Sequence, residues 1–312
     1  MIILPDRTGW LANRIFLFCQ FIIFSKEHDV RILNPGFNEY ADFFQTTSRQ
    51  SVSSFPFRKS VFGNSFFRKF FFKIIYFFSH SLIKTEKHLR KFRLFPGFVR
   101  IISLKAGMEF KLNTPENISL LKKSAFTILT GWEFRYEDID IVFSHHDIIK
   151  NYFLPCRQYL DQVDLLYSKI HSENENAIII GVHIRRGDYK TFESGHFFYE
   201  AEEYADCMKS AAGIFKVRNV VFLVCSNETI DPIVFKNHGL KFYFGTGDKI
   251  EDMYSLARCN YLMGPPSTYS MWASIYGKVP LYMIRKPGRA VRADDFSPPE
   301  KWMLPGSVDP LA

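Results

Sequence analysis

The second half of the chain alternates short apolar runs with longer mixed segments, and this pattern constrains the fold most. Residues 177–184 are apolar and rich in isoleucine, which is typical of a strand buried on both faces of a parallel sheet. Such alternation specifies a parallel sheet with right-handed crossovers, so we expect an α/β fold. Further strands are expected at 220–225, 241–244, 261–263 and 279–284, and helices at 199–215, 230–238, 250–259 and 267–276.

The first half predicts a less regular unit of the same class. A helix from Gly9 to about His28 separates strands expected at 1–4 and 30–35. Further strands are expected at 98–103 and 126–130, followed by one long helix at about 144–171. A chain of 312 residues is long enough for two domains with separate cores. We expect these domains to be residues 1–170 and 171–312.

Two arginines follow the strand at 177–184. Ligands bind beyond the carboxyl ends of strands in open α/β sheets, and Arg185 and Arg186 stand at such an end. Guanidiniums offer planar, bidentate donors to a phosphate group and keep their charge. Gly187 lets the backbone turn, and Asp188 can hold one arginine while the other stays available. The stretch therefore predicts a phosphate site.

Two other interpretations of this stretch remain open from its residues alone. Arg186-Gly187-Asp188 spells an integrin-type adhesion tripeptide, although such tripeptides lie on exposed loop tips and this one ends a buried strand. Alternatively, the two arginines form an ordinary solvated surface.

A second anion-binding element is expected between a strand and a helix, at residues 264–270. Ser267 and Thr268 would present hydroxyls and unpaired N–H groups at the helix N-terminus. The alternative is an ordinary N-cap. Paired with the arginine loop from another strand of the same sheet, this element could hold one diphosphate. Neither a G-x-G-x-x-G nor a P-loop pattern is present.

Asn13 stands near the start of the first long helix, just after Gly9. It is either an N-cap or, with neighbouring N–H groups, a contact to a ligand in a cleft.

A basic, phenylalanine-rich segment at 45–100 is expected to be an insert in the first domain. Eleven Lys or Arg residues and one acid, Glu86, lie between Phe57 and Arg100, whereas the whole chain has a net charge of +8. Such a helix suits an anionic membrane surface, or packs on the domain with a solvated basic face. Nucleic acid is not expected, because the basic residues interleave with apolar ones. On helical spacing, one face holds Phe67, Phe70, Phe71, Ile74, Phe77, Phe78 and Leu82, with Arg68, Lys69, Lys73, Tyr76 and His80 opposite.

Asp138 and Asp140 form a D-x-D tripeptide. In one glycosyltransferase architecture, two such carboxylates hold Mn²⁺ or Mg²⁺ on the nucleotide diphosphate. Here a helix is expected to follow, whereas the metal motif should close a strand, so we expect no metal site.

Five scattered cysteines without C-x-x-C spacing indicate free thiols in a reducing compartment. No basic leader precedes the first strand, and the early apolar run at 15–24 is too short to span a bilayer. We expect a cytoplasmic protein.

Three stretches together resemble a known family. His183-x-Arg185-Arg186-x-Asp188 resembles the donor-binding motif of fucosyltransferases that use GDP-fucose, and the continuation Gly-Asp-Tyr is closest to the α1,2 group. Residues 9–16 resemble the stretch that begins the α1,2 enzymes, with departures at Ala12 and Arg14. Residues 252–259 and 267–273 resemble the later motifs.

The resemblance implies a GT-B architecture, in which two Rossmann-like domains face a cleft and the second holds the nucleotide. It implies an inverting, metal-independent transfer of L-fucose from GDP-fucose to a glycan acceptor, with no further cofactor. Bacterial surface-polysaccharide synthesis at the inner membrane face is one setting. The alternatives are a metal-dependent transferase using Asp138 and Asp140, and a non-catalytic glycan- or nucleotide-binding protein.

The resemblance also implies roles for single residues. Arg185 would bind the β-phosphate, and Arg186 would pack against Asp188. Asp252 would recognise the nucleotide base, and Ser267 and Thr268 would contact phosphate. His183 would contact the base or its loop. Gly9 and Asn13 would contact the donor or acceptor sugar. The proposed catalytic base is Glu193, five residues after Asp188, with Asp188 as the second candidate.

Overall fold

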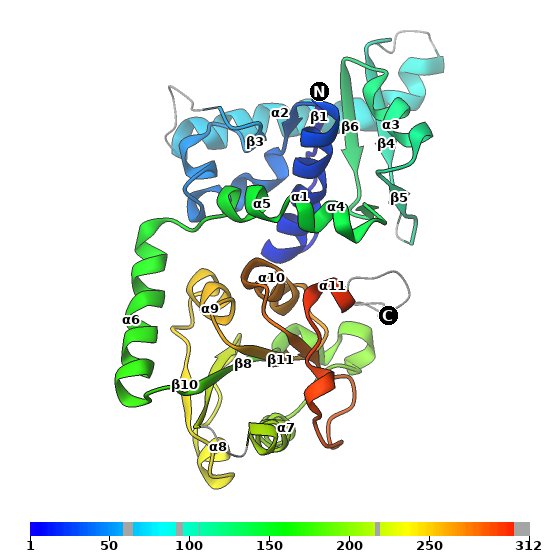
Figure 1. The fold of residues 1–312 in the computed structure, drawn as a ribbon. Coiled ribbons are helices and arrows are strands. Elements are labelled where there is room, and N and C mark those ends of the chain that lie inside the picture. Colours follow the sequence, from blue (N-terminus) through cyan, green and yellow to red (C-terminus); the bar gives the residue numbers. More distant parts are fainter. Residues whose placement is uncertain (59–64, 92–95, 106, 216–218, 303–312) are drawn as a thin grey trace. The chain divides into compact units, whose positions relative to one another are not determined.

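Two compact units make up the chain, and each contains its own sheet (Figure 1). The computed structural model describes residues 1–58, 65–91, 96–105, 107–215 and 219–302. The units are Met1–Cys156 and Arg157–Ala312, so the division falls before residue 170. Helix α6 (Arg157–Glu173) belongs to the second unit, because its Tyr167 hydroxyl donates to the Ser255 carbonyl over 2.8 Å.

Short strands form the sheet of the first unit. All neighbouring pairs are parallel except β2 and β3, and the strands predicted near 1–4, 30–35, 98–103 and 126–130 are confirmed. In spatial order the strands are β3 (Ser54–Phe55), β2 (Ile32–Leu33), β1 (Ile2–Ile3), β6 (Phe126–Thr130) and β4 (Val99–Ser103). A separate parallel pair is formed by β5 (Phe110–Lys111) and β7 (Phe134–Arg135).

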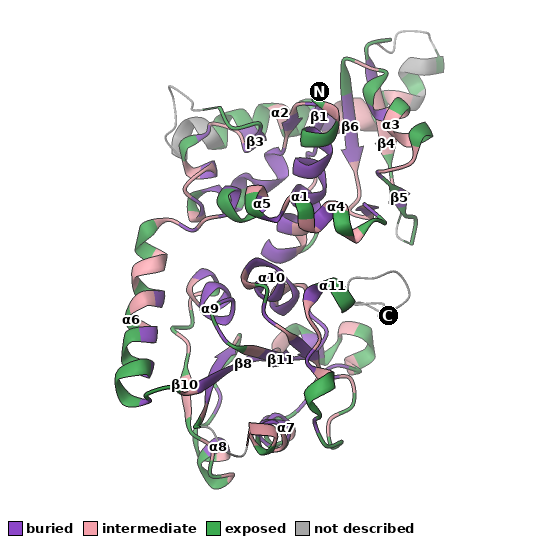
Figure 2. Cartoon of the chain, viewed as in Figure 1, coloured by how far each residue is buried: buried purple, intermediate pink, exposed green. Residues whose placement is uncertain are grey.

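The helices of the first unit pack on this sheet and on one another. Helix α1 (Leu11–His28) is apolar nearly all round and largely buried (Figure 2), as a helix without a polar face must be. Ile75, Leu82 and Ile83 of helix α2 (Ser65–Lys91) pack against a core cluster of the sheet. The segment 45–100 thus contributes to the packing of the domain, and its strand β3 pairs with β2. Up to residue 122, the other helical elements are α3 (Pro115–Lys122) and the 3-10 turns η1 (Pro35–Phe43) and η2 (Thr47–Arg49).

The single helix predicted at about 144–171 is wrong. The region holds α4 (Ile139–Ser144), α5 (His146–Tyr152) and α6. Pro155 causes the break after α5, because proline lacks an N–H group and disfavours helical backbone at the residue before it. At this break the Leu154 carbonyl accepts the N–H of Gln45 over 2.9 Å.

The second unit contains a fully parallel sheet in which β8 is central. The strands predicted from residue 177 onward are confirmed. In spatial order they are β10 (Phe242–Phe244), β9 (Val220–Ser226), β8 (Ile178–Ile184), β11 (Tyr261–Gly264) and β12 (Leu281–Met283). The chain runs from β8 to β9 and β10 on one side and then to β11 and β12 on the other. The topological switch point therefore lies between β8 and β11.

Helices connect these strands at the predicted positions. They are α7 (Ala201–Ala212), α8 (Ile233–Asn237), α9 (Lys249–Leu256) and α10 (Thr268–Gly277), with 3-10 turns η3 (Gly187–Lys190), η4 (Phe192–Gly195) and η5 (Gly213–Phe215). After the last strand come the 3-10 turn η6 (Ala293–Asp295) and helix α11 (Pro299–Trp302), which were not predicted. Among the described residues, no helix is both long enough and apolar enough to cross a bilayer.

Candidate functional site

The arginine loop begins where β8 ends, at Ile184. Arg185 and Asp188 form an ion pair, with Nη2 and Oδ2 2.8 Å apart. The predicted pairing of Arg186 with Asp188 is wrong, because the η3 turn brings Asp188 back to Arg185. Arg186 instead pairs with Glu200 at 3.0 Å and Glu228 at 3.3 Å. The two guanidiniums are thus held separately, each by carboxylates.

The loop after β11 lies beside the arginine loop. Ser267 caps α10, since its Oγ accepts the Tyr269 N–H over 3.3 Å. The Tyr189 hydroxyl, from the arginine loop, donates to the Pro266 carbonyl over 2.6 Å. Because β8 and β11 are parallel neighbours, both loops leave the same edge of the sheet, at its switch point. The predicted meeting of these loops is confirmed.

Tyr189 was not expected to link them. It is buried, and Arg185 lies over its ring at 5.6 Å from the centroid. An aromatic residue directly after Gly-Asp was the only sequence signal for this role.

Asp252 is a buried carboxyl group beneath a neighbouring loop. Its Oδ1 accepts the N–H groups of Thr246 at 2.8 Å and Gly247 at 3.3 Å. Burial raises the pKa of Asp252 to about 6, although these backbone N–H groups act in the opposite direction. A Cβ atom on Gly245 would lie 2.2 Å from Oδ1, so only glycine fits there. The loop and the carboxyl group are therefore built around each other.

His183 is buried in β8, with its ring centroid 4.8 Å from that of Tyr269. Burial, aided by the charge of Arg185, lowers the pKa of His183 to about 3. The imidazole is therefore neutral at physiological pH. Its Nδ1 and the Nε of Arg185 are buried atoms without a hydrogen-bond partner among the described residues. His183 is a candidate for holding the site together rather than for transferring a proton.

Glu193 lies on the η4 turn beyond the arginine loop, and its side chain is exposed. Glu193 and Ser194 both have left-handed backbone, with φ of 45° and 55°. Such conformations are costly for residues other than glycine and cluster at functional sites. The strained turn is compatible with a functional carboxylate at position 193, which stays a proposal.

The loop after β1 occupies the corresponding edge of the first sheet, where β1 and β6 form its switch point. Asp6 accepts the Gly131 N–H over 3.0 Å, and its Oδ1 lies 3.5 Å from Nε2 of His80. Burial is the largest influence on Asp6 and raises the pKa of its carboxyl group. Asp6 and His80 were not identified from the sequence.

Gly9 and Asn13 follow in this loop and the first turn of α1. Gly9 has a φ of 68°, and a Cβ atom there would lie 2.8 Å from that of Asn13. The interpretation of Asn13 as an N-cap is wrong, because the helix begins at Leu11 and Trp10 is the cap residue. Asn13 is half-buried on the first turn.

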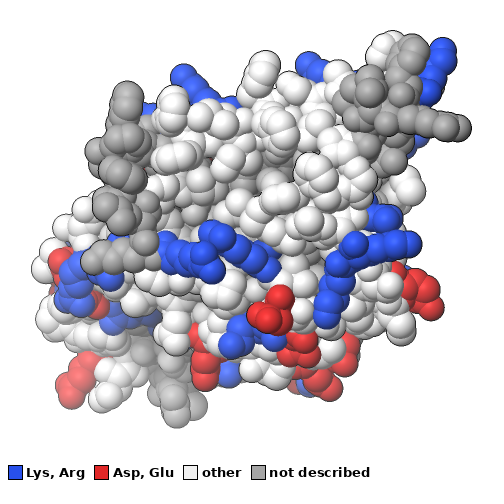
Figure 3. Space-filling view, turned by 90° about the horizontal axis from the view of Figure 1, so that it is seen from above, with Lys and Arg blue, Asp and Glu red and all other residues white. Residues whose placement is uncertain are grey.

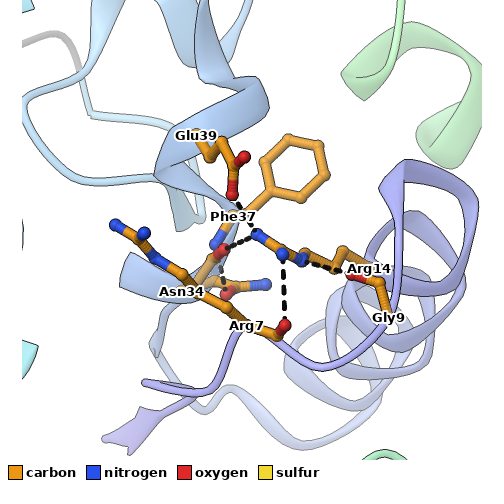
Figure 4. A network of polar contacts seen from close by, with 7 residues as sticks. Arg7, Gly9, Arg14, Asn34, Phe37 and Glu39 are labelled. Carbon is orange, nitrogen blue, oxygen red and sulfur yellow. Dashed lines mark hydrogen bonds and ion pairs between the residues drawn. The ribbon is translucent and has the colours of Figure 1, made fainter.

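Arg14 determines the shape of this loop (Figure 4). Its guanidinium donates to the carbonyls of Gly9, Arg7 and Gly36, each at 3.1 Å. It also pairs with Glu39 at 2.9 Å. The arginine thus ties the loop after β1 to the η1 turn, which the sequence did not reveal.

Asp138 and Asp140 lie at the start of α4, where Oδ1 of Asp138 accepts the Asp140 N–H over 2.9 Å. Asp138 is therefore the N-cap of this helix. Within the described ranges, no three His, Cys, Asp or Glu side chains are grouped as metal ligands.

Comparison with known proteins places these observations in a family. The model of glycosyl transferase family 11 matches residues 121–287, more than half of the chain. No curated protein matches the sequence significantly.

Solved structures share the fold at low sequence identity. Arabidopsis thaliana FUT1 in complex with GDP is 12% identical with a TM-score of 0.54, over 95% of this chain and 72% of that chain. POFUT1 in complex with GDP-fucose is 11% identical with a TM-score of 0.51, over 89% of this chain and 94% of that chain. The expectation of two Rossmann-like domains of the GT-B type is confirmed.

Proposed function

The chain belongs to glycosyl transferase family 11, and on this premise we propose that it transfers L-fucose from GDP-fucose to a hydroxyl of a glycan. The proposed reaction inverts the anomeric carbon, needs no metal ion and forms an α1,2-type linkage. One observation carries the proposal: two polar loops, joined by Tyr189 and Pro266, meet at the switch point of the second sheet. The FUT1 and POFUT1 structures contain GDP and GDP-fucose, which supports the same donor class here.

The leaving diphosphate would be held by the arginine loop and the start of α10. Arg185 has five donor positions, and Asp188 accepts from one of them, Nη2. The Nη1 donors and the second donor of Nη2 would bind the β-phosphate, whereas Nε is buried. Ser267 and Thr268 add N–H groups and hydroxyls at the positive end of a helix. These fixed charges and dipoles would stabilise the departing diphosphate without a metal ion.

Asp252 is proposed to recognise the guanine base. The hydrogen bonds from the loop all end on Oδ1, and Oδ2 would accept from the adjacent N–H groups of guanine. Only the ionised carboxylate accepts at both oxygens. Binding therefore favours the charged form, whereas burial favours the neutral one.

The pH dependence of donor affinity follows from this opposition. Folding raises the Asp252 pKa from 3.8 to about 6, so the group's contribution to stability is lost as pH rises through that window. Donor affinity should have the opposite pH dependence. It should fall about tenfold for each pH unit that the pH is lowered below 6. Calorimetric titration with GDP-fucose, whose diphosphate does not titrate in this range, measures the effect. In Asp252→Asn the slope should disappear; an equal slope in both proteins would contradict the assignment.

The acceptor hydroxyl needs a base that removes its proton as it attacks. We assign this role to the Glu193 carboxylate. Asp188 is the second candidate, because its carboxylate is already engaged in the ion pair with Arg185. Gly9 and Asn13 are proposed to contact the acceptor or donor sugar from the first unit.

The proposed location is the cytoplasm, at the inner face of a membrane, in surface-polysaccharide synthesis. The cysteines support a reducing compartment, since all five are free thiols and four are buried.

Incubation with GDP-fucose alone, followed by assay of released GDP, tests the proposed function. We expect slow hydrolysis, since a bound donor without acceptor remains open to attack by water. The rate should be unchanged in EDTA, and GDP-mannose serves as the donor control. Binding without any turnover, with or without a panel of sugar acceptors, would identify a non-catalytic binding protein. Loss of turnover in EDTA would instead identify a metal-dependent transferase.

A further inference from the structure

Helix α2 presents an apolar face to solvent. Its inward side is formed by buried Phe72 and Ser79 together with Ile75, Leu82 and Ile83, which pack on the sheet. The outward side carries aromatic rings: Phe77 is 74% exposed and Phe78 is 60% exposed. Among the described side chains of α2, the outward stripe consists of Phe70, Phe71, Ile74, Phe77 and Phe78. Contiguous exposed apolar residues of this kind mark an interaction surface.

Helical spacing determines which residues belong to this stripe. Positions 70, 74, 77 and 78 follow the 3.6-residue repeat and lie on one side of the helix. Leu82, expected on the same face, instead packs inward, while the side chain of Phe67 lies outside the described residues. The stripe is therefore a second apolar face, distinct from the one that anchors the helix.

Lysines border the stripe on one flank. Lys73, Lys84 and Lys91 recur close to whole helical turns and are exposed. The sequence of α2 contains seven Lys or Arg residues and one acid, Glu86. Figure 3 looks onto this side of the molecule, where uncharged side chains fill the middle, lysines and arginines lie around them, and acidic side chains occur only in the lower half of the view.

We propose that the outward face of α2 docks on an anionic lipid bilayer. A basic amphipathic helix lies in the plane of the interface, with its rings among the acyl boundary and its lysines at the anionic headgroups. A second copy of the chain fits less well. An antiparallel contact between two copies of α2 would place the lysine rows side by side, and like charges facing each other oppose association.

Docking would bring the acceptor-side loop of the first unit close to the headgroups. The Arg7 guanidinium lies 4.1 Å from the centroid of the Phe72 ring, and His80 of the same helix faces Asp6 at 3.5 Å. Both partners belong to the loop after β1. Helix α2 thus joins the membrane-facing surface to that loop. The docking itself does not depend on the proposed function.

Co-sedimentation of the full chain with vesicles tests the proposal. Vesicles of phosphatidylcholine with phosphatidylglycerol should bind the protein, and vesicles of phosphatidylcholine alone should bind it at least about tenfold more weakly. The double variant Phe77→Ser, Phe78→Ser should lose at least about tenfold in affinity. Each substitution of Lys73 or Lys84 by Ala should cost about fivefold, and less in high salt.

Exposed apolar residues of the second unit provide a matched control. Leu165 and Ile233 are 62% and 49% exposed, and their replacement by Ser should leave vesicle binding unchanged. Thermal unfolding verifies that every variant is folded. The proposal is overturned if the native protein does not bind anionic vesicles, or if the control variant loses as much vesicle affinity as the Phe variant. It is also overturned if sedimentation shows that the native protein is a dimer and the Phe variant a monomer, while both bind vesicles equally.

Discussion

Replacing Arg185 with Ala is expected to weaken GDP binding by at least about 100-fold, because each charge-assisted hydrogen bond to a phosphate stabilises the complex by about 1.5–3 kcal/mol. The GDP affinity of Arg185→Lys should lie between those of the native protein and Arg185→Ala, since an ammonium keeps the charge but cannot bind bidentately. Isothermal titration with GDP measures both effects. The melting temperature should change by a few degrees at most, because the Arg185–Asp188 ion pair is partly exposed.

Arg258 is the matched control for this experiment. It also forms an ion pair, with Asp164 at 2.6 Å, and lies over the ring of Tyr167. It stands between α9 and β11, at the amino edge of the same sheet. Arg258→Ala should therefore bind GDP normally. Equal affinity of Arg185→Ala and Arg258→Ala would remove Arg185 from the donor site.

Replacing Glu193 with Gln is expected to lower kcat by about 100- to 10,000-fold, the usual contribution of a positioned general base. The amide keeps the size of the side chain and leaves the left-handed backbone at residue 193 unchanged. GDP affinity should therefore stay within a factor of about two. Steady-state transfer to an acceptor, together with GDP titration, separates the two quantities.

Ser194→Ala is the control, because Ser194 adjoins Glu193 in the same strained turn but carries no carboxylate. If Glu193→Gln retains full kcat, the base is another group, and Asp188→Asn becomes the next variant to measure. A parallel loss of kcat in Ser194→Ala would point to the shape of the turn rather than to its charge.

The second unit could be predicted well from the sequence because its strands are buried on both faces. Residues 177–184 form an apolar run interrupted only by His183, and β8 is buried throughout. In a parallel sheet the chain direction then determines which edge receives the loops that follow the strands. That topology was enough to bring Arg185 and Ser267 together.

Contacts between side chains could not be predicted in the same way. The pairing of Asp188 depends on the η3 turn, and that of Arg186 on two carboxylates distant in the sequence, Glu200 and Glu228. Similarly, the network around Arg14 joins residues whose proximity depends on the η1 turn. Such contacts carry no periodic signal.

Helix α2 shows a related limit. Its spacing identified an aromatic stripe, but two apolar faces compete on this helix, and the periodicity does not show which of them the sheet covers. The sheet covers the face of Ile75, Leu82 and Ile83, and the richer aromatic stripe is left outside.

Amide hydrogen exchange with and without saturating GDP tests the central claim most directly. If the two joined loops at the edge of the second sheet hold the diphosphate, GDP should slow exchange in residues 185–191 and 264–270, and in the 245–247 loop beside Asp252. Helix α2 and residues 138–140 should exchange as before. Unchanged exchange in the first two segments, with protection at 138–140 instead, would contradict the claim.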